Sequence, residues 1–306
     1  MIKKDFYIEF ENEALHLIEW RPEGDVGAVL QIVHGMVEYI DRYDHFARFL
    51  SENGIAVVGH DHPGHGNTAR DSACLGVMKR KGGSDHLVSC THRVTEYIKE
   101  EFAGKRVFIL GHSMGSFVVR RFITSMSEKV CGAVIVGTGE PPRAALSAGK
   151  ALATLIGKAF GFKHRSKLLT DISFAGYNSR FSKDEGVHAW ISSDREIVAK
   201  YDRDPFCSYT FTAGGFLALY DTLLFLSKKT DTEKIRKDLP ILVAAGNDDP
   251  VGEYGKIPRA YFEFCRSLGI TDVSLLAYEG QRHEIINEKD RKRVHADIAD
   301  WLISKI

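Results

Sequence analysis

Short apolar segments alternate along the chain with longer segments whose apolar residues recur at helical spacing. The short segments are rich in β-branched residues and end at Gly or Pro, as buried strands do. The segment between the first two has Tyr43, Phe46 and Leu50 at helical spacing and Gly54 as a stop. The pattern predicts strands at 28–35, 54–62, 106–110, 130–137, 239–246 and 273–278, and helices at 41–54, 86–102, 116–126, 259–269 and 288–305.

This alternation of strands and helices predicts an α/β fold, with a mainly parallel central sheet and helices on both faces. The first two runs, "FYIEF" and "ALHLIEW", alternate in polarity and have a short connection, so they predict an antiparallel edge. The rhythm stops between 141 and 230, where helix-like stretches at 143–160, 184–193, 195–201 and 214–227 replace it. We therefore expect a core formed by 1–140 and 231–306, and a helical cap inserted at 141–230.

A serine lies between two glycines where a predicted strand meets a predicted helix. Residues 111–115 read "GHSMG", after "RVFIL" and before "SFVVRRFITSM". Strand, G-x-S-x-G and helix form a nucleophile elbow, a tight turn that exposes the serine Oγ above the sheet. Gly111 and Gly115 permit the turn because larger side chains would clash with the helix and the neighbouring strand. The pattern predicts Ser113 as a nucleophile; a Gly-rich turn with a capping serine is the alternative.

A serine nucleophile needs a base, and the base needs an orienting carboxylate. On this architecture the acid and then the histidine follow later strands. The strand "PILVAA" is followed by "GNDDPVG" and the strand "VSLLAY" by "EGQRHEIINE". The order predicts His283 as the base and leaves Asp248 and Asp249 open as the acid. The alternatives are a solvated loop histidine and simple turn formation by Asp-Asp-Pro.

Two backbone N–H groups are expected to stabilise the oxyanion of such an enzyme. One belongs to the residue after the nucleophile, Met114, and the other to the loop after the strand at 28–33. That loop reads "HGMVEY", and Met36 is the expected donor.

Composition and charge bear on the partners and the cellular location to be expected. The chain has 306 residues, of which 44% are hydrophobic, and its formal net charge is zero, so nucleic acid is not an expected partner. Five cysteines without CxxC spacing suggest reduced thiols. The N-terminus "MIKKDFYIEF" has no apolar signal-peptide core. These features predict a cytoplasmic protein and leave its oligomeric state open.

Four segments resemble α/β-hydrolase-fold serine hydrolases of the monoacylglycerol lipase and lysophospholipase group. They are "HGMVEYIDRYDHFARFLSENGIAVVGHDHPGHG", "GHSMGSFVVRRF", "GNDDPVG" and "GQRHEIINE", and the resemblance covers nearly the whole chain. It implies hydrolysis of a carboxylic ester with one long acyl chain, without metal or organic cofactor. The family pattern G-x-x-D after the strand selects Asp249 over Asp248. One departure is Pro63, where relatives more often have arginine.

Rival functions rest on other features. Within the same fold, a short-chain or aryl esterase is the nearest. An iminopeptidase-like activity would need carboxylates that recognise an amine, for which Glu196, Asp202 and Asp204 are candidates. A metal-dependent hydrolase would use His60, His62 and His65 of "HDHPGH", although Gly64 stands where a carboxylate ligand would be expected.

The stretch "GKAFGFKHRSK" at 157–167 interleaves Phe160 and Phe162 with basic residues. Such a stretch either lies on an anionic lipid surface or is a charged face over two buried phenylalanines. The first reading predicts transient membrane-surface contact through the cap.

Overall fold

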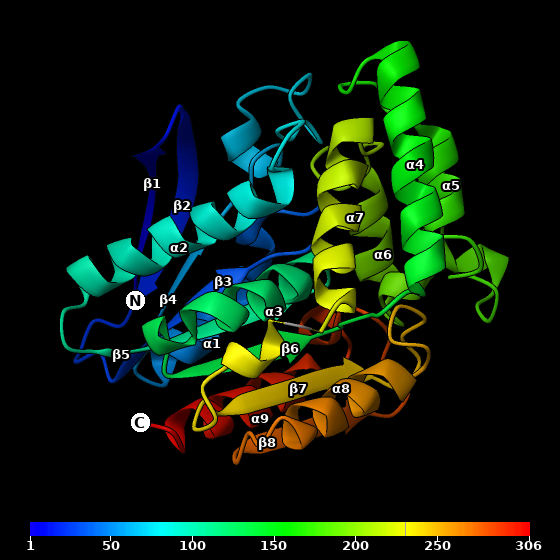
Figure 1. Ribbon diagram of the computed structural model, residues 1–306. Coiled ribbons are helices and arrows are strands. Elements are labelled where there is room, and N and C mark those ends of the chain that lie inside the picture. Colours follow the sequence, from blue (N-terminus) through cyan, green and yellow to red (C-terminus); the bar gives the residue numbers. More distant parts are fainter. Residues whose placement is uncertain (230) are drawn as a thin grey trace.

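The computed structural model describes residues 1–229 and 231–306, in which eight strands form one sheet in the order β1-β2-β4-β3-β5-β6-β7-β8 (Figure 1). The six strands from β4 to β8 in this order are parallel, and β1 and β2 form an antiparallel edge. The predicted sheet and its antiparallel edge are therefore confirmed. The strands are β1 (Ile2–Phe10), β2 (Glu13–Arg21), β3 (Ala28–Val33), β4 (Ile55–His60), β5 (Arg106–His112), β6 (Gly132–Val136), β7 (Ile241–Gly246) and β8 (Val273–Tyr278).

Helices cover both faces of this sheet. Val29 and Leu30, adjacent on β3, are both fully buried but belong to different hydrophobic clusters, because successive strand residues point to opposite faces. The cluster around Leu30 includes apolar residues of α1 (Asp44–Glu52) and α9 (Arg291–Ile303). The cluster around Val29 includes residues of α2 (Gly83–Glu101), α3 (Met114–Met126) and α8 (Lys256–Ser267). Burial on both faces explains the continuous apolar runs of the central strands.

Between β6 and β7 the chain forms helices, and we call the described residues 141–229 the insert. Its helices are α4 (Arg143–Phe160), α5 (Lys167–Ser173), α6 (Arg195–Arg203) and α7 (Ala213–Ser227). Figure 1 shows them together beside one end of the sheet. Helix α7 is apolar around most of its circumference because it packs against α2, α3 and α4 at once. Thr230, the predicted last residue of the cap, lies outside the described residues.

One local prediction within the insert, the helix at 184–193, is wrong, and one of the two alternatives for 157–167 is excluded. The segment 184–193 forms two short 3₁₀ turns, Lys183–Glu185 and Ala189–Ile191, because Gly186 between them has a φ of 110° that no helix contains. The stretch 157–167 is interrupted at Gly161, where α4 ends. Phe160 is 70% exposed, whereas Phe162 packs against Gly157, so the two phenylalanines are not both buried.

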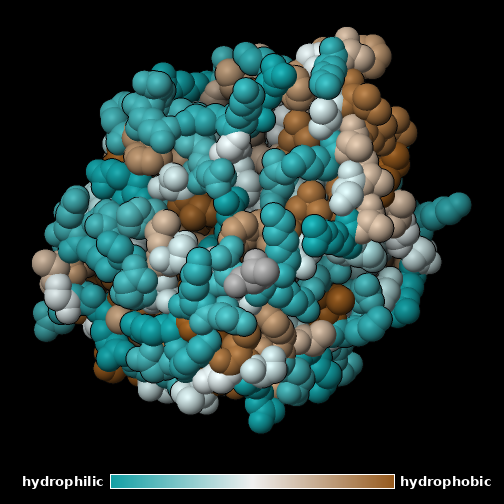
Figure 2. Space-filling model, in the orientation of Figure 1, coloured by the Kyte–Doolittle hydropathy of each residue, from teal (hydrophilic) through white to brown (hydrophobic). Residues whose placement is uncertain are grey.

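The surface in the orientation of Figure 1 is mostly hydrophilic, with hydrophobic residues gathered over the flank that carries α4 (Figure 2). In the part of the chain that the structure describes, no helix combines the length and the apolar character that crossing a bilayer requires.

Candidate active site

Ser113 is the single residue between the end of β5 and the start of α3, and its backbone conformation is rare for a residue with a side chain. Its φ is 52° and its ψ is −121°. A Cβ on Gly111 would lie 2.4 Å from the carbonyl oxygen of Gly115, and one on Gly115 would lie 2.0 Å from that of Val33. Glycine is thus required at both positions by close backbone contacts. Strain of this kind is concentrated at functional sites.

Asp249 and His283 meet at the carboxyl ends of β7 and β8. Both side chains are buried, and Nδ1 of His283 lies 3.0 Å from Oδ2 of Asp249. The other carboxylate oxygen, Oδ1, accepts a hydrogen bond from the backbone N–H of Val251 at 2.8 Å. Asp248 is exposed. The structure therefore brings His283 together with Asp249, the residue that the family resemblance selects.

The second ring nitrogen of His283, Nε2, is buried and has no hydrogen-bond partner among the described residues. A Cβ on Gly137, just after β6, would lie 3.1 Å from Cε1 of His283. The N–H of Ser113 donates to the carbonyl oxygen of Val136, the residue before Gly137, at 3.0 Å. The serine and the histidine ring thus lie at the same end of β6.

The loop after β3 lies directly beside Ser113. A Cβ on Gly35 would be 3.0 Å from Cβ of Ser113. Within the described residues, neither Met36 nor Met114 donates its backbone N–H to another protein group. Met114 is the first residue of α3, where N–H groups are free and the helix dipole is positive. Both amides are available to bind a developing oxyanion.

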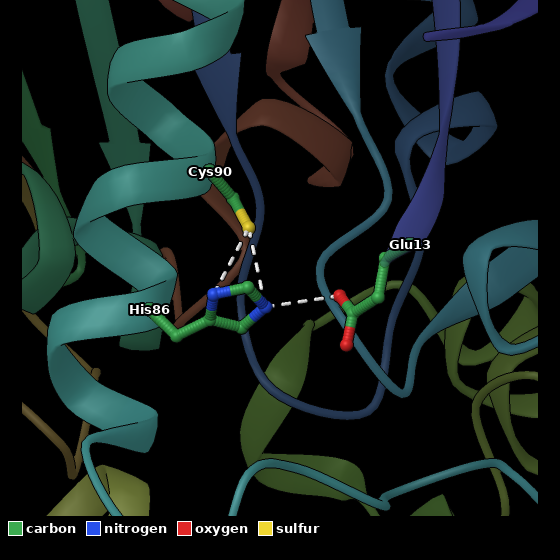
Figure 3. A group of neighbouring side chains, drawn as sticks. All are labelled: Glu13, His86 and Cys90. Atoms are coloured by element: carbon green, nitrogen blue, oxygen red, sulfur yellow. Dashed lines mark hydrogen bonds and ion pairs between the residues drawn. The ribbon is translucent and has the colours of Figure 1, made fainter. Parts of the chain in front are cut away.

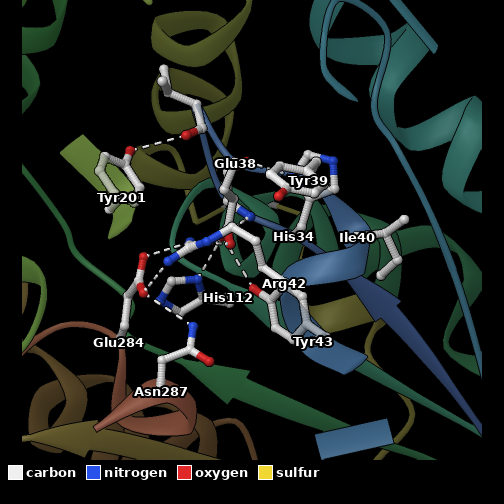
Figure 4. Close-up of polar contacts among 12 residues, drawn as sticks. His34, Glu38, Tyr39, Ile40, Arg42, Tyr43, His112, Tyr201, Glu284 and Asn287 are labelled. Atoms are coloured by element: carbon white, nitrogen blue, oxygen red, sulfur yellow. Dashed lines mark hydrogen bonds and ion pairs between the residues drawn. The ribbon is translucent and has the colours of Figure 1, made fainter. Parts of the chain in front are cut away.

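Glu38 is a buried carboxylate that holds this loop, and sequence reasoning missed it (Figure 4). Its Oε1 accepts from the N–H of Gly35 at 2.5 Å and lies 2.9 Å from Nδ1 of His112 and 3.1 Å from the hydroxyl of Tyr43. Arg42 donates to Oε2 at 3.0 Å. Burial would raise the pKa of Glu38, but the charges of His112 and Arg42 outweigh it and keep the pKa below its ordinary value. An acidic residue three positions after Gly35 in a buried loop is the signal that could have revealed this role.

Arg42 extends the network from the loop to the histidine and to the insert (Figure 4). Its guanidinium donates to both carboxylate oxygens of Glu284, the neighbour of His283, at 2.8 and 2.6 Å. The same guanidinium lies over the ring of Tyr201 on α6, 4.9 Å from its centroid. The hydroxyl of Tyr201 donates to the carbonyl oxygen of Val37 at 2.9 Å. A bidentate, buried pair of this kind fixes geometry as well as charge.

The insert also contacts His283 directly, through a residue that no local sequence pattern singles out. The ring of Trp190 lies 5.0 Å from the ring of His283, centroid to centroid. The N–H of Glu284 donates to the carbonyl oxygen of Ile191 at 2.7 Å. Arg282 donates to the carbonyl oxygens of Ala189 and Ser192 and to the carboxylate of Glu185. The histidine loop is therefore held by the segment 185–192 of the insert.

A cavity of about 860 Å³ opens over Ser113. Met36 and Val37 of the loop after β3 line it, and the rest of its wall comes from the insert. The apolar and aromatic part of that wall includes Phe174, Tyr177, Trp190, Tyr209 and Phe211. Its volume falls in the range of sites for small organic ligands.

The histidines considered as metal ligands are buried and kept neutral. Burial lowers the pKa of His60 and that of His65 to about 3. Nε2 of His62 lies 3.1 Å from the carbonyl oxygen of His34. Within the described residues, the ligating atoms of these three side chains do not form a set with the separations a bound metal needs. The metal-site interpretation of "HDHPGH" therefore has no structural basis.

Comparisons with known proteins find one matching family model, and lipases and esterases among the relatives. The family model Hydrolase_4, described as "Serine aminopeptidase, S33", matches residues 24–290. A monoglyceride lipase homolog of monkeypox virus is 25% identical over 97% of this chain and 96% of its own, and a monoacylglycerol lipase of Mycolicibacterium smegmatis is 25% identical over 94% and 92%. A solved carboxyl esterase of Bacillus coagulans, in complex with glycerol, superposes with a TM-score of 0.90 at 25% identity over 99% of both chains.

Proposed function

The chain belongs to the Hydrolase_4 family and is a carboxylic-ester hydrolase with the α/β-hydrolase fold, and we propose that it cleaves monoacylglycerol- or lysophospholipid-type esters through Ser113, His283 and Asp249. One observation carries this proposal. A strained serine lies at the base of a cavity with a largely apolar wall, at the same end of β6 as a histidine whose Nε2 is buried and unpartnered among the described residues.

The reaction proceeds in two acyl-transfer steps. Nε2 of His283 takes the proton of the Ser113 hydroxyl as its oxygen attacks the ester carbonyl. Asp249 keeps Nδ1 protonated and stabilises the imidazolium that forms. His283 then gives its proton to the departing alcohol, and water repeats the sequence on the acyl-enzyme. The N–H groups of Met36 and Met114 bind the oxyanion in each tetrahedral intermediate, a contribution of about 2.7–4 kcal/mol per donor in a well-studied protease.

The cavity wall supports an ester with one long acyl chain. Aromatic side chains of the insert offer apolar surface to the acyl chain, and polar residues such as Ser179 and Ser208 offer hydrogen bonds to a small head group. The names of the relatives, a monoacylglycerol lipase among them, point the same way. A short-chain or aryl esterase of the same fold is the alternative within this chemistry.

We propose that the insert acts as a cap that docks on lipid surfaces. Leu155 and Phe160 of α4 and Leu168 and Ile172 of α5 are each more than half exposed. Lys158, Lys163 and Lys167 lie among them in sequence. Apolar residues flanked by cations are typical of proteins that bind anionic membrane surfaces.

Vesicle binding tests the cap proposal. The protein should co-sediment with vesicles that contain anionic lipid at low salt, and Phe160→Glu should reduce the bound fraction. Ile303→Glu is the matched control, because Ile303 is exposed on α9 of the core. Equal binding by both variants, or none by the unaltered protein, would refute the proposal.

An aminopeptidase, as the family description names it, has weaker support. Asp202 lies 2.5 Å from Nδ1 of His188, and Asp204 accepts a hydrogen bond from the hydroxyl of Tyr39 at 2.7 Å. Both carboxylates are thus already engaged, and neither they nor Glu196 line the cavity over Ser113. Recognition of a substrate amine would require a free carboxylate that faces the cavity, and Asp171, which lines it, is paired with Lys167 at 2.7 Å.

Hydrolysis of p-nitrophenyl esters from acetyl to palmitoyl, beside 1-monoacylglycerol, lysophosphatidylcholine and an aminoacyl arylamide, tests the proposal. Activity that rises toward medium or long chains and disappears in Ser113→Ala supports it. A preference for acetyl and butyryl esters would retain the serine mechanism and assign a short-chain esterase. Activity on the arylamide alone would replace the ester proposal with the peptidase.

A further inference from the structure

Three potential metal ligands from two separate parts of the chain meet between β2 and α2, outside the cavity over Ser113 (Figure 3). His86 and Cys90 are four residues apart on α2 and therefore project from the same face of the helix. Glu13 is the first residue of β2, at the end of the β1–β2 turn. One ligating atom from each side chain lies within 4.8 Å of the other two.

The separations within this group are near those between the ligands of a tetrahedral cation, and one of them falls within that range. Nε2 of His86 lies 3.0 Å from Oε2 of Glu13 and 3.7 Å from Sγ of Cys90. With metal–ligand bonds of about 2.0–2.3 Å, neighbouring tetrahedral ligands lie roughly 3.3–3.8 Å apart. Sγ also lies 4.0 Å from Nδ1 of His86, so in the structure the sulfur faces the ring and not the outward lone pair of Nε2. Binding of one ion therefore requires the Cys90 side chain to turn toward the Nε2 side, together with a shift of Glu13, whose side chain is 32% exposed.

The surroundings hold the imidazole in place. The side chain of His86 is 4% exposed, and its ring stacks on Phe10 with an interplanar angle of 16°. Nδ1, the ring nitrogen that does not face Glu13, lies 3.5 Å from a carboxylate oxygen of Glu11. A carboxylate behind the second nitrogen of a ligating histidine is a recurrent feature of metal sites.

We propose that Glu13, His86 and Cys90 bind a divalent cation of the zinc type that joins the β1–β2 hairpin to α2. Sulfur, imidazole and carboxylate together favour Zn²⁺ over Ca²⁺ or Mg²⁺, which prefer oxygen ligands only. The partly exposed side of Glu13 leaves room for water as the fourth ligand. This site does not depend on ester hydrolysis and shares no residue with it.

Binding changes the protonation of the group in a defined way. The Cys90 thiol gives up one proton to solvent as its sulfur bonds to the cation, so one proton leaves for each ion bound. His86 binds through the lone pair of Nε2 and carries its proton on Nδ1, facing Glu11. Lys79, whose ammonium lies 3.1 Å from Nδ1 in the structure, must then turn away, and its 40% exposed side chain can do so.

Titration of the intact protein with Co²⁺, followed by Zn²⁺ competition, tests the site. One Co²⁺ per chain should produce sulfur-to-cobalt charge-transfer absorption and the intense visible bands of tetrahedral coordination, and Zn²⁺ should abolish both. Saturating Zn²⁺ should also raise the melting temperature.

Variants identify the ligands. Glu11→Gln removes a partner of the ligating histidine and should weaken Zn²⁺ binding roughly 10–100-fold. Cys90→Ser and His86→Gln each remove a ligand and should weaken it more. Cys265→Ser, which removes another buried thiol, is the control and should bind as the unaltered protein does. Glu13→Gln provides a mild variant if the others do not fold. Absence of the charge-transfer band, or its survival in Cys90→Ser, would overturn the proposal.

Discussion

Replacing Glu38 by glutamine removes the charge from a carboxylate that contacts four groups around the candidate oxyanion loop. Its oxygens accept hydrogen bonds from Gly35 and Arg42 and contact His112 and Tyr43. In the variant, the amide keeps one acceptor oxygen but presents an N–H₂ group to a cation. Removing one partner of a buried ion pair costs about 3–5 kcal/mol, so we expect a loss of stability of that size.

The same change should reduce catalysis through the position of the loop. If the hydrogen bond from the Gly35 N–H is weakened, the neighbouring N–H of Met36 is no longer held in its direction toward the oxyanion. Loss of one oxyanion donor costs about 2.7–4 kcal/mol, which corresponds to a fall of about 10²–10³-fold in kcat. KM should change little, because the contact forms only in the transition state. Glu38 is thus a positioning residue.

Glu19→Gln is the control that separates lost stability from a misplaced loop. Glu19 is fully buried on β2 and lies 2.9 Å from Arg21, and none of its contacts among the described residues reaches the candidate site. Both variants should lose stability in urea unfolding, whereas only Glu38→Gln should lose kcat for p-nitrophenyl butyrate, assayed well below both melting temperatures. A Glu38→Gln enzyme with the kcat of Glu19→Gln would refute this reasoning.

Other consequences of the structure can be measured separately. Asp249→Asn should lower kcat by about 10⁴-fold because the histidine tautomer is lost, whereas the exposed neighbour Asp248→Asn should not; equal effects would contradict the assignment. Because the pKa values of His60 and His65 are lowered to about 3 by burial, the unfolded chain binds more protons than the folded one below about pH 6.5. On acidification from about pH 6.5 toward 3, each histidine should therefore lower the free energy of unfolding by about 1.4 kcal/mol per pH unit. Urea unfolding across this range would measure the slope, and His65→Gln should reduce it. Gly115→Ala should lower the melting temperature strongly because its Cβ would lie 2.0 Å from the carbonyl oxygen of Val33, and an unchanged value would show that the elbow can relax.

The order of elements in the core could be predicted because each element carries its own periodic signal. Helix α4 begins and ends at the predicted residues 143 and 160, and the strand at 273–278 also has its predicted bounds. The insert was harder to predict. Helix α5 is short and depends on Ser166, which caps it, and on packing against α4. The segment 184–193 is shaped by contacts with Arg282 and Glu288, almost one hundred residues away, that no local pattern contains.

The candidate site divides in the same way. Ser113, Asp249 and His283 each follow a strand of the sheet, so spacing and the family pattern were sufficient to propose them. Glu38 and Trp190 act through contacts across the fold. Their roles depend on which side chain lies against His112 or His283, and the sequence contains no period that reports this.

Covalent labelling of the nucleophile tests the central claim most directly. Incubation with a long-chain alkyl fluorophosphonate, from which the Ser113 oxygen would displace fluoride, followed by mass spectrometry of the intact protein and its peptides, should show one adduct per chain on Ser113. Labelling should disappear in Ser113→Ala, and it should slow strongly in His283→Gln because the hydroxyl then keeps its proton. An unlabelled Ser113, or full ester hydrolysis by Ser113→Ala, would contradict the proposed serine mechanism.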